Sequence, residues 1–177
     1  MNELINAYNQ THFKVNIFKK PILVGQVSDE LEAFLAAHDF TSWAFITAFN
    51  PRSVLLSAEE NENRNGLLRE LLGQYTILDG IGIDSEEKWP GENSFLVFDI
   101  RRADAILLAK EFEQNAIVFG HKNHARKKVE CRRFEVLRQA VDKIAPLPGA
   151  ARRAVQEHDQ RGRRRARKFD RGSSHGA

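Results

Sequence analysis

Apolar residues recur at two different periods along the chain, and each period predicts a different kind of element. Residues 43–49 are almost all apolar, which is typical of a central strand buried on both faces. Alternation and shorter apolar runs predict three more strands, and apolar residues at helical spacing predict two helices between them. The predicted core strands are 43–49, 75–83, 94–100 and 116–119, and the predicted core helices lie within 57–73 and 105–112.

The order of these core elements is β-α-β-β-α-β, which is typical of ferredoxin-like folds. Before them, alternation over 13–17 and the apolar run 22–24 flank a turn at 19–21 and predict a β-hairpin. Asp29 and Glu32 have the spacing of a capping box, so a helix is predicted to begin there. We therefore expect an α+β domain with a ferredoxin-like core, an N-terminal hairpin plus helix, and a C-terminal extension.

The last third of the chain changes in composition. Residues 131–137 predict one more strand, and 139–144 predict a short helix. Residues 145–150 predict a Pro/Gly linker, and 151–177 are so poor in apolar residues that a disordered tail is predicted. The predicted organisation is a single domain over 1–144, a linker over 145–150 and an Arg-rich tail over 151–177.

Length and cysteine content limit the class of protein. A chain of 177 residues can form one domain with a substantial core. The single cysteine, Cys131, excludes an intramolecular disulfide. Residues 1–12 lack the apolar centre of a signal peptide, and no apolar run approaches the ~20 residues that cross a bilayer. We expect a soluble, cytoplasmic protein with no membrane partner and no cofactor. The sequence leaves the oligomeric state open.

Charge is segregated along the chain. Residues 1–120 carry a net charge of −8, whereas 121–138 carry +5 and 151–177 carry +6. The acidic part repels polyphosphates, so contact with nucleic acid is expected only of the tail, where Phe169 can also stack on a base. Solubility, or contact with the acidic part, is the alternative role. The predicted nucleic-acid-binding residues are Arg161, Arg163, Arg164, Arg165, Arg167 and Lys168.

Polar residues follow several predicted strand and helix ends, and the predicted topology places them at one end of the sheet. Asn50-Pro51 ends the first core strand, and Ser57 with Glu60 forms a capping box at the start of the next helix. The same residues can instead cap turns and helix ends without binding anything. The predicted ligand-binding residues are Thr47, Asn50, Asn61, Trp89, Glu92 and Gln114.

Metal and nucleophile chemistry have weaker signals. Glu92 with Glu59 or Glu60 offers carboxylates to a hard cation, but acids at a helix start are favoured by the helix dipole alone. His121, His124 and Cys131 have loose spacing for zinc, lack a fourth ligand and stand among basic residues. Cys131 also has no histidine base at a fixed spacing. We predict no metal site and no covalent nucleophile.

The order and spacing of these polar segments resemble a bacterial family, the domain of unknown function DUF3293. The residues that carry the resemblance are Thr47 to Pro51, Asn61, Trp89 with Glu92, and Gln114 to Ile117. The resemblance covers roughly residues 8–120. It implies a shared site but no established activity, and the Arg-rich tail looks like an addition to the family core.

Two classes of function are compatible with this pattern. The first is a domain that binds a small polar ligand, with a basic tail that contacts nucleic acid. The alternative is a hydrolase or transferase in which Glu92 is the acid/base residue and Asn50 and Asn61 orient the substrate. A protein–protein interaction module is a third interpretation. The sequence alone therefore leaves open whether the protein is an enzyme.

Overall fold

The computed structural model describes residues 2–86, 90–122 and 130–133, and the side chains within 6–86 and 90–122. The helices are α1 (Asn2–Gln10), α2 (Asp29–Ala37), α3 (Ala58–Leu71) and α4 (Arg102–Glu111), with a short 3-10 helix η1 (Pro51–Ser53). The strands are β1 (Thr11–Val15), β2 (Ser42–Ile46), β3 (Ile77–Asp84), β4 (Glu92–Phe98), β5 (Ala116–His121) and β6 (Glu130–Arg133). The predicted α+β class is confirmed.

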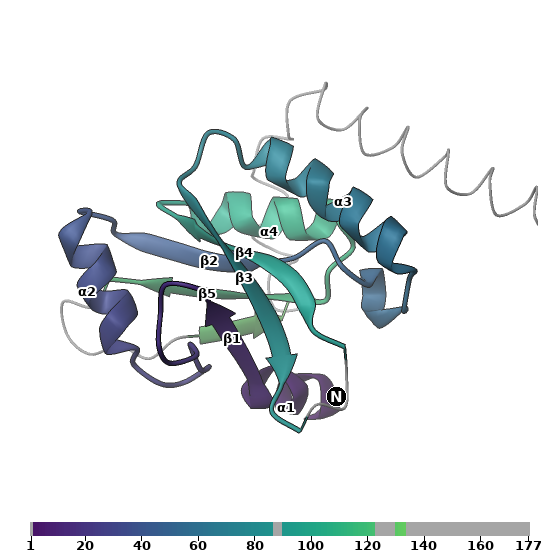
Figure 1. Ribbon diagram of the computed structural model, residues 1–177, viewed down its shortest axis with the longest axis horizontal. Coiled ribbons are helices and arrows are strands. Elements are labelled where there is room, and N and C mark those ends of the chain that lie inside the picture. The colour runs from purple at the N-terminus through teal and green to yellow at the C-terminus, as the bar shows by residue number, and fades with distance from the viewer. Residues whose placement is uncertain (1, 87–89, 123–129, 134–177) are drawn as a thin grey trace, which may run out of the picture. The chain divides into compact units, whose positions relative to one another are not determined.

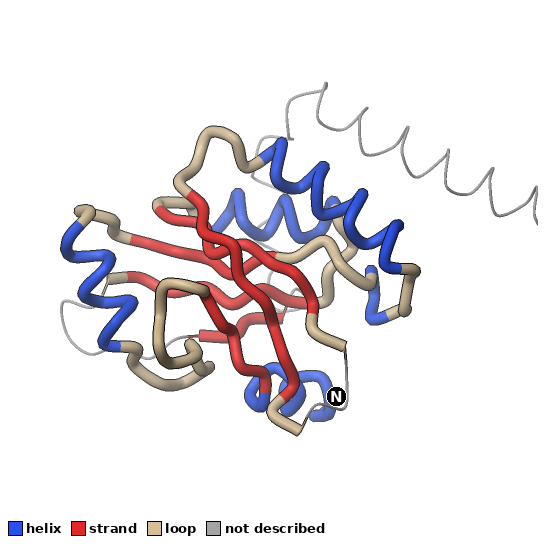
Figure 2. Tube along the Cα trace, in the orientation of Figure 1, coloured by secondary structure: helices blue, strands red, loops and turns tan. Residues whose placement is uncertain are grey.

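The strands form one antiparallel sheet in the order β1-β3-β4-β2-β5-β6 (Figure 1, Figure 2). The core elements β2, α3, β3, β4, α4 and β5 follow the predicted β-α-β-β-α-β order. Every residue of β2 is buried, which explains its continuous apolar pattern and its place between β4 and β5. The predicted strand at 131–137 is present in part, as β6 paired with β5.

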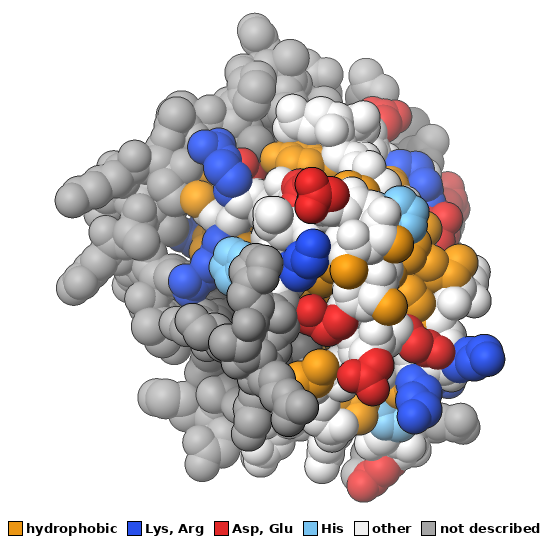
Figure 3. Space-filling view, turned by 90° about the vertical axis from the view of Figure 1, so that its left-hand side faces the viewer, with side chains coloured by type: hydrophobic (Ala, Val, Ile, Leu, Met, Phe, Trp, Pro, Cys, Tyr) orange, Lys and Arg blue, Asp and Glu red, His pale blue; other side chains and the backbone are white. Residues whose placement is uncertain are grey.

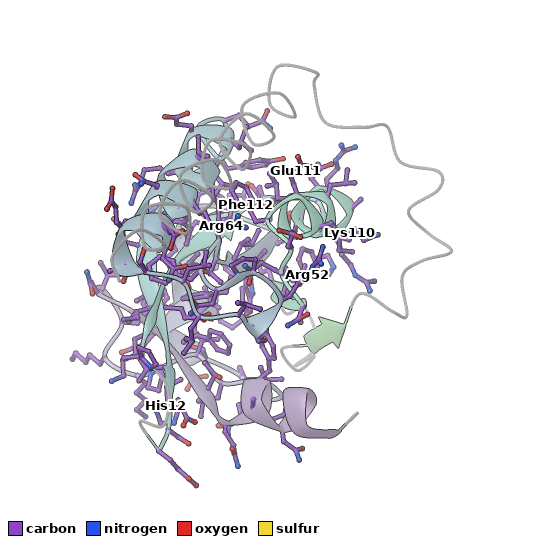
Figure 4. All side chains as sticks on the ribbon, turned by 90° about the vertical axis from the view of Figure 1, so that its right-hand side faces the viewer. His12, Arg52, Arg64, Lys110, Glu111 and Phe112 are labelled. Carbon is purple, nitrogen blue, oxygen red and sulfur yellow. The ribbon has the colours of Figure 1, made fainter. Side chains whose placement is uncertain are left out.

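Helices cover both faces of the sheet. Figure 4 shows α3 and α4 on one side and α1 on the other. Trp43 and Phe45 of β2 belong to an apolar cluster that includes Leu31 and Leu35 of α2. Residues of a strand alternate between faces, so Ala44 and Ile46 face the side of α3 and α4. The apolar cores on the two faces of the sheet therefore contain alternate residues of β2.

The N-terminal part differs from the predicted hairpin. The predicted strand 22–24 is reduced to a single bridge between Phe13 and Ile22, and β1 pairs along its whole length with β3 instead. Gly80 allows this pairing, because a Cβ atom there would come within 2.8 Å of the Lys14 carbonyl oxygen. Helix α1 was not predicted, because its residues are largely polar.

The local signals at two helix starts have different outcomes. The capping box of Ser57 and Glu60 is present at the start of α3 and is confirmed. The box predicted for Asp29 and Glu32 is wrong, because Ser28 caps α2 by accepting a hydrogen bond from the Leu31 N–H. The cap lies one residue earlier, and Asp29 occupies the first turn, where the helix dipole favours an acid.

The first core strand is shorter than predicted. Its ladder ends at Ile46 rather than residue 49, because side chains replace the ladder partners beyond that point. The Ala48 N–H donates to Asn65 Oδ1 at 3.2 Å, and the Phe49 N–H donates to Thr47 Oγ1 at 3.0 Å. The segment thus leaves the sheet while its polar backbone groups stay paired.

Several predictions fall outside the described residues: Trp89, the 139–144 helix, the 145–150 linker and the 151–177 tail with its arginines. The boundary at residue 144 therefore stays a prediction.

Among the described residues no helix is long and apolar enough to span a bilayer. On the described surface of the face seen in Figure 3, acidic and basic side chains are interspersed with hydrophobic ones.

Candidate functional site

Asn50 is the centre of a hydrogen-bond network where the chain leaves β2. Its backbone N–H donates to Asn61 Oδ1 at 2.8 Å, and its Oδ1 accepts from Asn61 Nδ2 at 3.0 Å and from the Leu56 N–H at 3.1 Å. Its Nδ2 donates to Glu92 Oε1 at 2.7 Å. Since two donors meet Oδ1, the amide has one orientation, and Nδ2 is directed at the Glu92 carboxyl.

The backbone at this point has an unusual conformation. Asn50, Arg52 and Ser53 all have positive φ angles, of 44°, 54° and 60°. Residues other than glycine adopt this region at a cost, and such strain persists only where surrounding contacts hold it. Glu113 supplies part of the hold, because its carbonyl accepts from the Arg52 N–H at 2.9 Å and its carboxylate pairs with the Arg52 guanidinium at 2.5 Å.

Arg64 and Gln114 fix the segment 48–50 from behind. Arg64 donates to the Ala48 carbonyl at 3.0 Å and to the Phe112 carbonyl at 2.8 Å, and Figure 4 shows it beside Phe112. Gln114 Nε2 donates to the Phe49 carbonyl at 2.7 Å. These bonds join α3, the end of α4 and the exit of β2, so the position of Asn50 depends on three separate parts of the chain.

Thr47 ties the same segment to β4. Its hydroxyl donates to the Asn93 carbonyl at 2.7 Å while accepting from the Phe49 N–H. Asn93 follows Glu92 directly in β4. The bond therefore sets the distance between the strand exit and the carboxyl of Glu92.

Glu92 has an environment that favours its neutral form. Burial raises the pKa of its carboxyl above the ordinary value of 4.5, and the hydrogen bond from Asn50 opposes that rise only in part. Among the described residues no Lys, Arg or His forms an ion pair with Glu92. The carboxyl can therefore hold a proton more readily than an exposed glutamate does.

A cavity of about 460 Å³ lies beside this network, between α1 and the sheet. Its lining is mostly apolar and includes the edge-to-face pair Phe13 and Phe45, whose ring centroids are 5.1 Å apart. The lining residues are Ala7, Tyr8, Thr11, Phe13, Phe45, Thr47, Asn50, Ser53, Leu55, Gly82, Asp84, Pro90, Glu92, Ser94, Ala116 and Val118. The cavity has the size and composition of a small-molecule site.

The structure brings together five of the predicted ligand-binding residues, but in two layers. Thr47, Asn50 and Glu92 line the cavity. Asn61 and Gln114 do not line it and instead hold the 48–50 segment. Trp89 lies outside the described residues. The role of all six predicted residues in ligand binding stays a prediction.

Sequence reasoning missed the aromatic wall of the cavity. Phe13 and Phe45 lie in strands that the apolar pattern predicted. Side chains alternate between the two faces of a strand, and this signal could have placed both residues on the same face. No such signal existed for Ala7 and Tyr8, because α1 was not predicted.

One of the two carboxylates at the start of α3 is already engaged. Glu60 Oε2 accepts from the Ser57 hydroxyl at 2.7 Å, and this bond, with that from the Ser57 N–H, lowers the pKa of Glu60. Within the described residues no group of three His, Cys, Asp or Glu could hold a metal ion. The alternative zinc set includes His124, which lies outside them.

A known family model matches part of the chain. Residues 46–117 match the family model described as a protein of unknown function, DUF3293. This segment is a DUF3293 domain. It is narrower than the predicted span of 8–120, yet it contains all the predicted ligand-binding residues, from Thr47 to Gln114. No curated protein and no solved structure matched the chain.

The DUF3293 domain does not include the whole cavity. It supplies the polar end, with Thr47, Asn50 and Glu92, whereas Tyr8 and Phe13 come from the segment before it. The family description assigns no activity, so any function has to be argued from the cavity and its residues.

Proposed function

We propose that the cavity between α1 and the sheet binds a small molecule with an apolar body, and that Glu92 contacts its polar group. The observation that carries the proposal is a cavity of about 460 Å³ whose lining is mostly apolar but includes the half-buried carboxyl of Glu92. Such a lining favours a ligand that is less polar than the sequence suggested, because its hydrocarbon surface leaves water on binding.

The network around Asn50 supports a binding role. The Asn50 side chain holds Glu92, and the hydrogen bonds from Leu56 and Asn61 fix the orientation of Asn50. The Glu92 side chain therefore loses little conformational freedom when a ligand binds. The strained conformation of Asn50, Arg52 and Ser53 lies at the same place, and such strain concentrates at functional sites.

The mouth of the cavity supports the same proposal. Leu55 lines the cavity and is 67% exposed, and its neighbour Val54 is 59% exposed. A ligand in the cavity would cover part of this apolar surface.

We also propose that β2, α3, β3, β4, α4 and β5 constitute a ferredoxin-like core. The order of these elements and the strand order β3-β4-β2-β5, with every neighbouring pair antiparallel, support this assignment. In this arrangement α3 and α4 leave the opposite face of the sheet to the N-terminal segment, which completes the cavity.

A second candidate is an enzyme in which Glu92 transfers a proton. The raised pKa of Glu92 favours this alternative, because an acid/base residue works best when its pKa lies nearer to neutrality. Under this proposal, Glu92→Gln abolishes turnover of a substrate while its binding is retained. Loss of binding together with turnover would instead favour a binding role for the carboxyl.

The binding proposal is tested by filling the cavity. A Cβ atom at Gly82 would make ordinary contacts of 3.6 Å with Thr11 and 3.8 Å with Phe13, so the backbone admits a side chain there. Gly82 lines the cavity, so the methyl groups of Gly82→Val would occupy ligand space. A library of small apolar molecules is screened by thermal shift against the wild type. A ligand at ten times its Kd stabilises the protein by about 1.4 kcal/mol, which is a shift of a few degrees.

Hits that fail to stabilise Gly82→Val, yet still stabilise Gly66→Ala, would support the cavity as their site. Gly66 is the matched control because it lies outside the cavity and a Cβ atom there meets nothing within 4 Å. Hits with equal shifts in both variants bind elsewhere and contradict the proposal.

The tail adds a separate proposal that rests on composition. Residues 151–177 carry a net charge of +6, which favours contact with nucleic acid. Removal of residues 150–177 is expected to abolish salt-sensitive nucleic-acid binding and to leave the thermal midpoint nearly unchanged. Equal affinity of the full-length and shortened chains for a single-stranded oligonucleotide would refute this role.

A further inference from the structure

The charges around the cavity select among ligands. Among its described lining residues there is no Lys, Arg or His, while Asp84 and Glu92 are both carboxylic acids. His12 lies between Thr11 and Phe13 in β1, so strand alternation places it on the opposite face. An anionic ligand would therefore meet carboxyl groups and no cation in this part of the chain.

The two acidic residues are diagonal neighbours on one face of the sheet. Gly82 of β3 is paired with Glu92 of β4, and Asp84 follows Gly82 by two residues. Diagonal neighbours of this kind are about 7–8 Å apart between their Cα atoms. Because Gly82 has no side chain, the space directly opposite Glu92 is left to the cavity.

The aromatic residues complete the chemistry. Phe13 and Phe45 form one wall of the cavity, and Tyr8 of α1 also lines it. Aromatic faces attract cations and also accept apolar groups. A molecule with an apolar body and a positively charged head would match both parts of the lining.

We propose that the ligand of this cavity is an amine, with its ammonium group beside Glu92 and its hydrocarbon body against Phe13 and Phe45. This inference rests on the proposed binding function and adds the ligand's chemical class. An ammonium group gives Glu92 the cationic partner that it lacks among the described residues, where Asn50 supplies only a neutral donor. An alcohol of the same shape can hydrogen-bond but cannot neutralise the carboxyl.

The test uses three molecules with one body and different heads: phenylpropylamine, phenylpropanol and phenylpropanoate. Their Kd values for the full chain are measured by isothermal titration calorimetry at pH 7 and low salt, because added salt weakens attraction between charges. We expect the amine to bind about tenfold more tightly than the alcohol and the carboxylate to bind most weakly.

Two variants connect this preference to the site. In Glu92→Gln, the amine is expected to lose about tenfold more affinity than the alcohol, because the glutamine amide still hydrogen-bonds a hydroxyl but carries no charge. Retained binding of the alcohol also shows that the cavity is intact. Glu70→Gln is the control, because Glu70 is an exposed acid of α3 that does not line the cavity. It should leave all three affinities unchanged.

The outcomes separate the inference from the proposed function. If the alcohol binds and the amine binds no better, or if Glu92→Gln leaves the amine's affinity unchanged, the amine assignment is wrong and the cavity remains a binding site. If all three molecules fail to bind, both proposals are overturned. If the carboxylate binds most tightly, the charge argument fails and the amine assignment is wrong.

Discussion

The network around Asn50 predicts that Asn61 is the residue whose loss is felt most strongly. Asn61 is 5% exposed, and its amide is bonded to both the backbone N–H and the side-chain oxygen of Asn50. Asn61→Ala removes both bonds and leaves the Asn50 N–H buried without an acceptor. The Asn50 oxygen keeps its bond from the Leu56 N–H. The carbonyl of the half-buried Leu56 loses a longer bond from Asn61 Nδ2, of 3.4 Å, so the Asn50 N–H is the buried group that is left stranded.

The magnitude follows from these two losses. A stranded buried N–H costs about 1–3 kcal/mol, and the second bond contributes about 1 kcal/mol more. We expect a loss of about 3 kcal/mol in the free energy of unfolding, which lowers the thermal midpoint by roughly 6–12 °C in a protein of this size. The positive φ angle of Asn50 adds to the effect, because that conformation is then held by fewer contacts.

The assay is urea unfolding followed by tryptophan fluorescence, since Trp43 is 1% exposed in the folded core. Asn63→Ala is the matched control, because Asn63 is an exposed asparagine on the same helix. Both variants gain the same helix propensity, up to about 0.7 kcal/mol, so their difference isolates the network. Equal midpoints for Asn61→Ala and Asn63→Ala would refute the reasoning.

Three further predictions concern the same framework. Gln114→Ala strands the Phe49 carbonyl and should lower the free energy of unfolding by about 1–3 kcal/mol in urea titrations, whereas the exposed Gln74→Ala should change it little. Gly80→Ala should destabilise the β1–β3 pairing and lower the thermal midpoint, because its Cβ atom would come within 2.6 Å of the Phe45 ring. Gly66→Ala is the control: its Cβ atom meets open space, so the free energy of unfolding should rise by about 0.5–1 kcal/mol. The raised pKa of Glu92 means that the folded state binds this proton more tightly than the unfolded state does. The stability that the protonated carboxyl contributes is therefore present below the ordinary pKa of 4.5 and is lost as pH rises through the folded-state pKa. Relative to Glu92→Gln, the wild type should therefore lose stability over that pH range in urea titrations, and parallel curves for the two proteins would contradict the assigned environment.

The sequence alone located the polar end of the site. The break at Asn50-Pro51 and the core order β-α-β-β-α-β were enough to place Thr47, Asn50, Asn61, Glu92 and Gln114 at one end of the sheet. This worked because strand direction follows from counting elements, and the apolar run of β2 is long enough to be unambiguous. The same reasoning also predicted the Ser57 and Glu60 capping box, which depends only on local spacing.

Other features depended on contacts that no local pattern records. The partner of β1 is β3, about 70 residues later, because the glycines of β3 admit a close neighbour whereas 22–24 provides a single paired residue. The division of the polar residues into a layer facing the cavity and a layer behind it also required coordinates. Hydrogen bonds between residues distant in sequence decided which face each amide presents.

Pattern and spacing thus determined which elements form, their order and the end of the sheet where polar residues gather, since these follow from backbone geometry and hydrophobic periodicity. Only the tertiary structure decided that an apolar cavity lies beside them. The cavity is lined by residues of α1, β1, β2 and β5, and packing between such distant segments depends on side-chain volume rather than on local sequence.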